Sequence, residues 1–222
     1  MPEVRGVALD MDGLMFDTEP LYELAADRLL QLRGRRYEDA VRRQMMGQPG
    51  PQAIRLMLDH YGLDEPWQAV LAEAEGIFAE LIQQELRTLP GLPALLATLD
   101  ALAIPYGVAT SSRRTFAEDL LARGGVHTSL RFVLTGDDVT HGKPHPEIYL
   151  AAAETLGIAA SSLMVFEDSG NGCAAAVAAG AVTVAVPGPH SVHHDFSGAA
   201  LVADSLEDPR LLALVDQCCR RL

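Results

Sequence analysis

Short apolar runs alternate with helical segments over much of the chain. Strands are expected at residues 106–109, 132–134, 163–166 and 182–186, with a helical segment between each pair. This alternation is typical of βαβ units, in which helices connect parallel strands. A further apolar run at residues 4–9 supplies an earlier strand. We therefore predict an α/β fold with a parallel, Rossmann-like sheet.

One long stretch interrupts the alternation. From residue 19 to residue 86, apolar residues recur at steps of three and four, with glycine and proline between segments. We predict an α/β core domain of residues 1–16 and 88–222, with a small all-helical domain of residues 17–87 inserted. Ligands bind outside the carboxyl ends of parallel strands, so an insertion after the first strand could cover such a site.

Composition narrows the possible functions. The 222 residues carry a net charge of −13, and we find no basic patch suited to nucleic acid. No segment has the pattern of a signal peptide or a membrane span, so we expect a cytoplasmic protein. The three cysteines form no disulfide framework, and no Cys/His spacing resembles a zinc site. The histidines near residue 190 follow a Pro-Gly-Pro loop and are not expected to bind metal.

Two apolar strands end in acidic pairs. Asp10 and Asp12 follow the first strand, and Glu167 and Asp168 close the strand at 163–166. Each pair alone could belong to an ordinary turn or helix cap. If the two strands are neighbours, the carboxylates crowd together and require a cation or protonation. An all-oxygen set suits Mg²⁺, and Mn²⁺ or Co²⁺ could replace it.

Two other polar groups fall at strand ends or loops on the same side of the predicted sheet. Lys143 lies between glycine and proline, which constrains its backbone. Thr110, Ser111 and Ser112 close the strand at 106–109, where hydroxyls and free N–H groups can cradle phosphate.

The order of these motifs resembles that of the haloacid dehalogenase superfamily. The segments that carry the resemblance are Asp10-Met-Asp-Gly-Leu14, Thr110, His141-Gly-Lys-Pro-His-Pro-Glu147 and Phe166-Glu-Asp-Ser-Gly-Asn-Gly172. The helical insertion looks like the family's small four-helix cap. The branch it resembles holds β-phosphoglucomutases, phosphoglycolate phosphatases, sugar phosphatases and pseudouridine monophosphatases.

The resemblance implies a role for each motif. Asp10 would attack phosphorus and become an aspartyl phosphate, with Lys143 offsetting the charge repulsion. Asp12 would protonate the leaving oxygen and then activate water. Thr110, with the N–H groups of Ser111 and Ser112, would hold the phosphoryl oxygens.

The resemblance also implies a metal site. Asp10, Asp168 and the backbone carbonyl of Asp12 would be ligands, with Glu167 near the metal or acting through water.

A Mg²⁺-dependent phosphatase of small phosphate monoesters fits the motifs best. The presence of Asp12 favours phosphoryl transfer over carbon–halogen cleavage, which has no leaving oxygen to protonate. A phosphosugar mutase is the alternative. Tyr22 and Arg114 stand where β-phosphoglucomutases carry histidine and asparagine, which weakens that alternative. A phosphoacceptor signalling domain is a third alternative, and the insertion argues against it.

Substrate choice is expected to rest on the insertion. The candidates there are Glu19, Tyr22, Gly47, Gln48 and Arg55. The expected partner is a small phosphorylated metabolite, a sugar phosphate or nucleoside monophosphate, bound by a monomer or homodimer.

Overall fold

The chain divides into two compact units. The computed structural model describes residues 3–45, 48, 50–126 and 129–219. One unit comprises Met1–Asp17 and Arg87–Leu222, and the other comprises Thr18–Leu86. Among the described residues, no helix combines the length and apolar character needed to cross a membrane.

The first unit is built on a six-stranded parallel sheet with the order β3-β2-β1-β4-β5-β6. Its strands are β1 (Gly6–Leu9), β2 (Tyr106–Ala109), β3 (Val133–Leu134), β4 (Leu163–Glu167), β5 (Val182–Ala185) and β6 (Leu201–Val202). All residues of β1, β2, β4 and β5 are buried, as expected where helices cover both faces of a parallel sheet. The predicted α/β fold is thereby confirmed.

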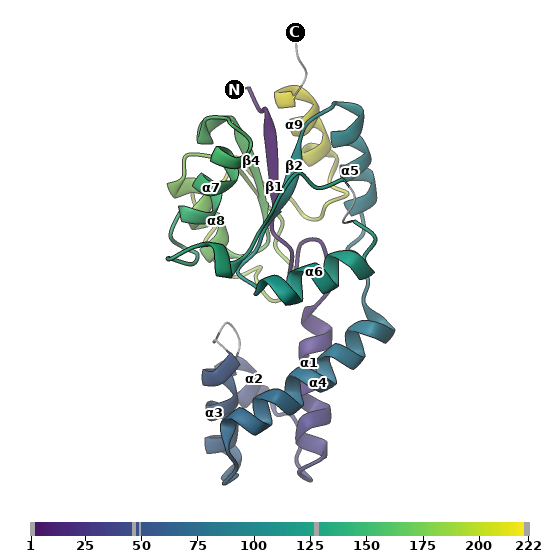
Figure 1. The fold of residues 1–222 in the computed structure, drawn as a ribbon, viewed down its shortest axis with the longest axis vertical. Helices are drawn as coiled ribbons and strands as arrows, with labels where there is room; N and C mark the ends of the chain where they lie inside the picture. The colour runs from purple at the N-terminus through teal and green to yellow at the C-terminus, as the bar shows by residue number, and fades with distance from the viewer. Residues whose placement is uncertain (1–2, 46–47, 49, 127–128, 220–222) are drawn as a thin grey trace. The chain divides into compact units, whose positions relative to one another are not determined.

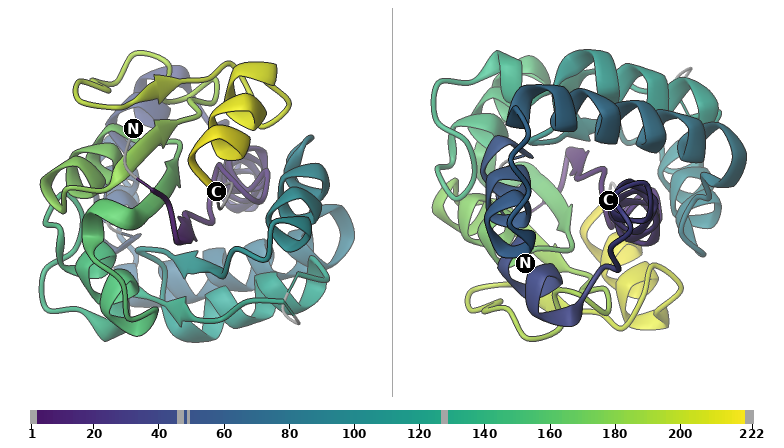
Figure 2. Two further views of the ribbon diagram at one scale, coloured as in Figure 1. Left: turned by 90° about the horizontal axis from the view of Figure 1, so that it is seen from above. Right: turned by 90° about the horizontal axis from the view of Figure 1, so that it is seen from below.

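Helices cover both faces of this sheet. They are α5 (Leu92–Ala101), α6 (Arg114–Arg123), α7 (Glu147–Thr155), α8 (Gly170–Ala178) and α9 (Pro209–Cys219), with short 3₁₀ turns at Gly136–Asp138 and Ala160–Ser162. Helices α7 and α8 lie against one face, and α5 and α9 lie on the other (Figure 1, Figure 2). Tyr149 and Ala152 of α7 pack with Ala8 of β1 and Val165 of β4 in one buried cluster.

Among the described residues of the second unit, the regular secondary structure is helical. They are α1 (Glu19–Gln31), α2 (Asp39–Met45), α3 (Gly50–Tyr61) and α4 (Trp67–Glu85). Its core gathers Leu29, Leu30, Met57 and Val70 from three of these helices. The unit therefore has a hydrophobic core of its own.

The two chain segments that lead to and from the second unit run side by side within the first. The N–H of Asp17 donates to the carbonyl of Arg87 at 3.0 Å. Phe16 also forms an antiparallel bridge with Thr88. The chain thus leaves and re-enters the first unit at one place.

Candidate active site

The pairing of β1 with β4 brings the two acidic motifs together. Leu9 lies opposite Phe166 in the parallel register, and the N–H of Asp10 donates to the carbonyl of Phe166 at 3.0 Å. Carboxylate oxygens of Asp10, Glu167 and Asp168 lie within 4.8 Å of one another. The two strands are therefore neighbours, which is the condition under which the carboxylates were expected to crowd together.

The Lys143 ammonium lies among these carboxylates. Its Nζ donates to Oδ1 of Asp10 at 2.5 Å, to Oε1 of Glu167 at 2.6 Å and to the carbonyl of Ala109 at 3.0 Å. These bonds use all three ammonium protons. Burial lowers the pKa of Lys143, but the carboxylates of Asp10 and Glu167 outweigh it and hold that pKa well above its ordinary value. Lys143 is therefore a fixed positive charge.

Glu167 is fully buried and accepts four hydrogen bonds. Oε1 accepts from Lys143 at 2.6 Å and from the Tyr149 hydroxyl at 2.7 Å. Oε2 accepts from the N–H of Ser169 at 3.1 Å and from its hydroxyl at 2.9 Å. Because a carboxylate has about four acceptor positions, these bonds use its capacity. This geometry favours Glu167 as a group near a metal over Glu167 as a direct ligand.

Two residues of this site have no role in the sequence prediction. Tyr149 bonds Glu167 and places its ring 5.1 Å from the Lys143 ammonium. Ser169 holds Glu167 and also caps α8, since its hydroxyl accepts from the N–H of Gly172 at 3.1 Å. A serine before a helix is a recognisable cap signal, whereas Tyr149 reads as an ordinary core residue of an amphipathic helix.

The charges of the site balance only if a cation binds there or some of the carboxyl groups are protonated. Three carboxylates and one ammonium leave an excess of negative charge in a buried cluster. Burial raises the pKa of Asp10 to about 7, against the opposing charge of Lys143. Burial, with the charges of Asp10 and Glu167, raises the pKa of Asp168 to about 9. A hard divalent cation fits this all-oxygen set, because it would neutralise the excess charge.

Asp12 and the residues that follow β2 lie beside this charged cluster and are hydrogen-bonded to one another. The hydroxyl of Ser112 donates to Oδ2 of Asp12 at 2.7 Å, which links the end of β1 to the end of β2. Thr110 is buried, and its hydroxyl accepts from the N–H of Ser112 at 3.1 Å. That N–H is thus engaged, while Ser111 is exposed. Thr110, Ser111 and Ser112 follow β2 and thus lie at the same edge of the sheet as Asp10.

The candidate substrate residues belong to the helical unit. Glu19 begins α1, and Tyr22 stacks on Phe78 with ring centroids 4.1 Å apart. The guanidinium carbon of Arg55 lies 4.4 Å from the centroid of the Trp67 ring. Gln48 is exposed. Gly47 lies outside the described residues.

Gly172 leaves space for the Glu167 carboxylate, which predicts a steric effect. A Cβ at Gly172 would overlap both carboxylate oxygens of Glu167. We expect Gly172→Ala to lower the free energy of unfolding by about 2 kcal/mol or more, because overpacking strains a dense core. Urea denaturation measures this change.

Gly76 provides a matched control on α4. A Cβ there meets nothing within 4 Å, and the residue is exposed. Gly76→Ala should therefore raise the free energy of unfolding by about 0.5–1 kcal/mol, because alanine favours a helix interior. Equal stability of Gly172→Ala and the parent protein would contradict the steric argument.

Comparison with known proteins gives a consistent result. A family model described as haloacid dehalogenase-like hydrolase matches residues 7–186. A "Probable pseudouridine-5'-phosphatase" of Drosophila melanogaster is 35% identical over 212 residues, covering 93% of this chain and 91% of the relative. A "Phosphorylated carbohydrates phosphatase" of Thermotoga maritima is 32% identical over 181 residues, covering 80% and 82%.

The fold also matches a solved structure. A Thermotoga maritima protein described as "putative beta-phosphoglucomutase" superposes with a TM-score of 0.85 at 28% identity. The match covers 96% of this chain and 99% of that chain.

Proposed function

Given that the chain belongs to the haloacid dehalogenase-like hydrolase family and is a phosphoric monoester hydrolase, we propose that it cleaves small phosphate monoesters through an aspartyl phosphate on Asp10. The observation that carries this proposal is the pairing of Asp10 with Lys143 at 2.5 Å at the carboxyl end of β1. A carboxylate held beside a fixed cation can approach a phosphate dianion, because the cation offsets the repulsion between them.

Asp10 is the nucleophile in this proposal. One of its oxygens bonds to phosphorus as the bond from phosphorus to the leaving oxygen breaks. Lys143 stays protonated, holds Asp10 in position and faces the negative charge of the transferring group. Glu167 and Tyr149 act through Lys143 as positioning residues.

Asp12 moves the protons. It lies two residues after Asp10, and the Ser112 hydroxyl orients its carboxylate through the 2.7 Å bond to Oδ2. In its protonated form Asp12 gives a proton to the leaving oxygen. The resulting carboxylate then takes a proton from the water that attacks the aspartyl phosphate. Inorganic phosphate leaves, and both aspartates return to their initial states.

The acidic cluster supplies the ligands for Mg²⁺. Asp10, Asp168 and the backbone carbonyl of Asp12 would hold the ion, with Glu167 beside them. When bound, Mg²⁺ neutralises negative charge on the nucleophile and on the phosphoryl group. Thr110 and the residues that follow it would hold the phosphoryl oxygens.

The helical unit, residues 18–86, would act as a cap that selects the substrate. Two relatives are named "Probable pseudouridine-5'-phosphatase" and "Phosphorylated carbohydrates phosphatase". We therefore propose a nucleoside monophosphate or a sugar phosphate as the substrate class. Glu19, Tyr22, Gln48 and Arg55 are the residues to test for substrate preference.

A substrate panel with and without chelator tests the proposal. We expect phosphate release from one or more of pseudouridine 5'-phosphate, sugar phosphates, glycerol 3-phosphate and phosphoglycolate in the presence of Mg²⁺. Because the proposed reaction uses a cation held by this cluster, EDTA should reduce release to background, and added Mg²⁺ should restore it. A malachite green assay measures the phosphate.

Three outcomes would contradict the proposal. Undiminished release in EDTA would refute the role of the acidic cluster as a metal site. Conversion of a hexose 1-phosphate to its 6-phosphate, detected by ³¹P NMR without net phosphate release, would identify a mutase. Labelled phosphate retained on the protein without turnover would instead identify a phosphoacceptor domain.

A further inference from the structure

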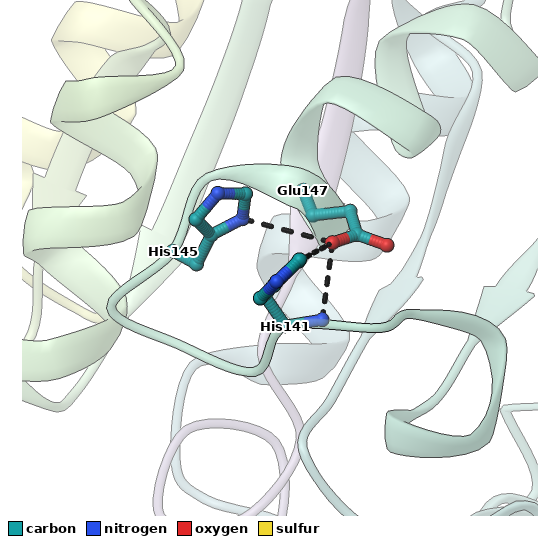
Figure 3. Close-up of side chains that lie close together, drawn as sticks. All are labelled: His141, His145 and Glu147. Atoms are coloured by element: carbon teal, nitrogen blue, oxygen red, sulfur yellow. Dashed lines mark hydrogen bonds and ion pairs between the residues drawn. The ribbon is translucent and has the colours of Figure 1, made fainter.

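Three side chains outside the acidic site converge on one point of the loop that carries Lys143. They are His141 and His145, each two residues from Lys143, and Glu147 at the start of α7. Figure 3 shows both imidazole rings turned toward one carboxylate oxygen of Glu147. The side chains of His141 and His145 are 62% and 51% exposed, so a solvated ion can reach them. No step of the proposed reaction uses them.

The distances suit a small cation. Nδ1 of His141 lies 2.9 Å from Oε2 of Glu147, and Nδ1 of His145 lies 3.7 Å from the same oxygen. Two ligand atoms at about 2.05 Å from a tetrahedral zinc ion lie about 3.3 Å apart. Each observed separation differs from that value by about 0.4 Å. Ligand atoms of all three residues lie within 4.8 Å of one another, so small rotations of the exposed rings would complete the set.

Hydrogen bonds already hold the carboxylate of Glu147 in one orientation, as is typical of a metal ligand. The N–H of Thr140 donates to its Oε1 at 2.7 Å, and the N–H of His141 donates to Oε2 at 3.0 Å. The bond from Thr140 is the main cause that lowers the pKa of Glu147 to about 2, so the group is a carboxylate at neutral pH. Partners of this kind orient a metal ligand and reduce the cost of ordering it.

We propose that His141, His145 and Glu147 form a second cation site, selective for a borderline transition metal of the Zn²⁺ class. Two imidazoles and one carboxylate are the ligands such ions favour, whereas Mg²⁺ prefers oxygen ligands alone. Each coordinating Nδ1 presents its lone pair, and the ring proton resides on Nε2. Water fills the remaining positions, because the cluster is open to solvent.

A bound ion would join residues on both sides of Lys143. The ligands at positions 141 and 145 bracket the lysine, and the N–H of His145 already donates to the carbonyl of Gly142 at 3.0 Å. The proposal is independent of the phosphatase mechanism, because it concerns binding at different atoms. Failure of one would leave the other intact.

The proposal is tested by measuring the affinity of the protein for Zn²⁺ in a large excess of Mg²⁺, which would occupy the acidic cluster. Competition with a chromophoric chelator measures the Zn²⁺ dissociation constant of the parent protein and of His141→Asn/His145→Asn. Loss of a second-layer partner already weakens metal sites about 10–100-fold, so removal of two ligands should weaken binding at least about tenfold. His145→Asn is a milder second variant, since His145 makes only a 3.7 Å ion pair with Glu147.

Electron spin-echo spectroscopy of bound Cu²⁺ separates the two cation sites. The acidic cluster offers only oxygens, so imidazole nitrogen modulation reports histidine ligands, and its loss in His141→Asn/His145→Asn would assign it to the proposed site. The matched control, His60→Asn/His193→Asn, removes two histidines elsewhere and should keep both the signal and the zinc affinity. Unchanged zinc affinity in folded His141→Asn/His145→Asn, or an equal loss in the control, would overturn the proposal.

Discussion

Replacement of Asp10 by asparagine is expected to lower kcat for phosphate release by at least about 10³-fold while the protein stays folded. Asparagine keeps the shape of the side chain and an oxygen that can accept from Lys143, but it lacks the anionic nucleophile. Stability should change little, because burial raises the pKa of Asp10 to about 7, so its ionised form contributes little to stability at neutral pH, and Lys143 keeps its partner Glu167. The substitution also removes one charge from a crowded group of carboxylates.

Two measurements separate chemistry from folding for this variant. Steady-state phosphate release gives the loss of activity, and thermal unfolding followed by circular dichroism gives the stability. Asp119→Asn is a matched control, since Asp119 pairs with Arg123 on the exposed surface of α6. It should retain the parent activity. Clear turnover by purified Asp10→Asn would refute the assignment of Asp10 as the nucleophile.

Replacement of Lys143 by methionine is expected to impair both activity and stability. Methionine has a similar length, so the change removes the charge and its three hydrogen bonds with little loss of volume. Removal of a preorganised charge beside a transferring phosphoryl group should lower kcat/KM by about 10²–10³-fold or more. Removal of one partner from a buried ion pair should also lower the free energy of unfolding by about 3 kcal/mol.

The stability effect has its own control and its own test. Arg123→Met removes a charge from an exposed ion pair on α6 and should cost less than about 1 kcal/mol. Urea denaturation of both variants without divalent cation measures the difference. If Lys143→Met and Arg123→Met unfold at the same urea concentration as the parent, the buried lysine does not stabilise the carboxylate cluster.

The sheet was predictable because its evidence is local. Residues 163–166, for example, are all apolar, and polar residues follow them at once, so the position of such a strand can be predicted from a short stretch of sequence. The order of the strands is not local. Asp10 lies near Glu167 because β1 pairs with β4. The two strands are separated by 153 residues, and no local sequence pattern indicates that they pair. From the sequence alone, the meeting of the carboxylates follows only on the condition that the two strands are neighbours.

The supporting residues of the site were less predictable. Tyr149 occupies a helix position that an apolar aromatic residue could fill, and only the structure reveals its bond to Glu167. Gly172 looks like one glycine among several, and its function is to leave space for that carboxylate. The residue types carry no sign of these roles, because each role depends on a partner distant in sequence.

The histidine cluster illustrates the same limit. We expected no zinc site, because the usual zinc patterns combine histidines with a cysteine pair, and this chain has no such pair near its histidines. His141, His145 and Glu147 instead converge through the turn of one loop. The four-residue interval between His141 and His145 matches a known histidine ligand spacing, but no cysteine pair accompanies it, and Glu147 lies outside that pattern.

The paired linkers at Phe16–Asp17 and Arg87–Thr88 have a consequence for how this chain tolerates its insertion. Closing a loop costs entropy that grows only with the logarithm of its length, about 0.6 kcal/mol for each doubling. Extending a turn from about seven residues to about seventy would thus cost only about 2 kcal/mol. The helical unit has its own core, and the two chain segments that flank it are hydrogen-bonded to each other within the α/β unit. For the α/β unit, the insertion is therefore equivalent to a short turn. Insertions of very different size and sequence could therefore exchange at this point while the Asp10 site is preserved.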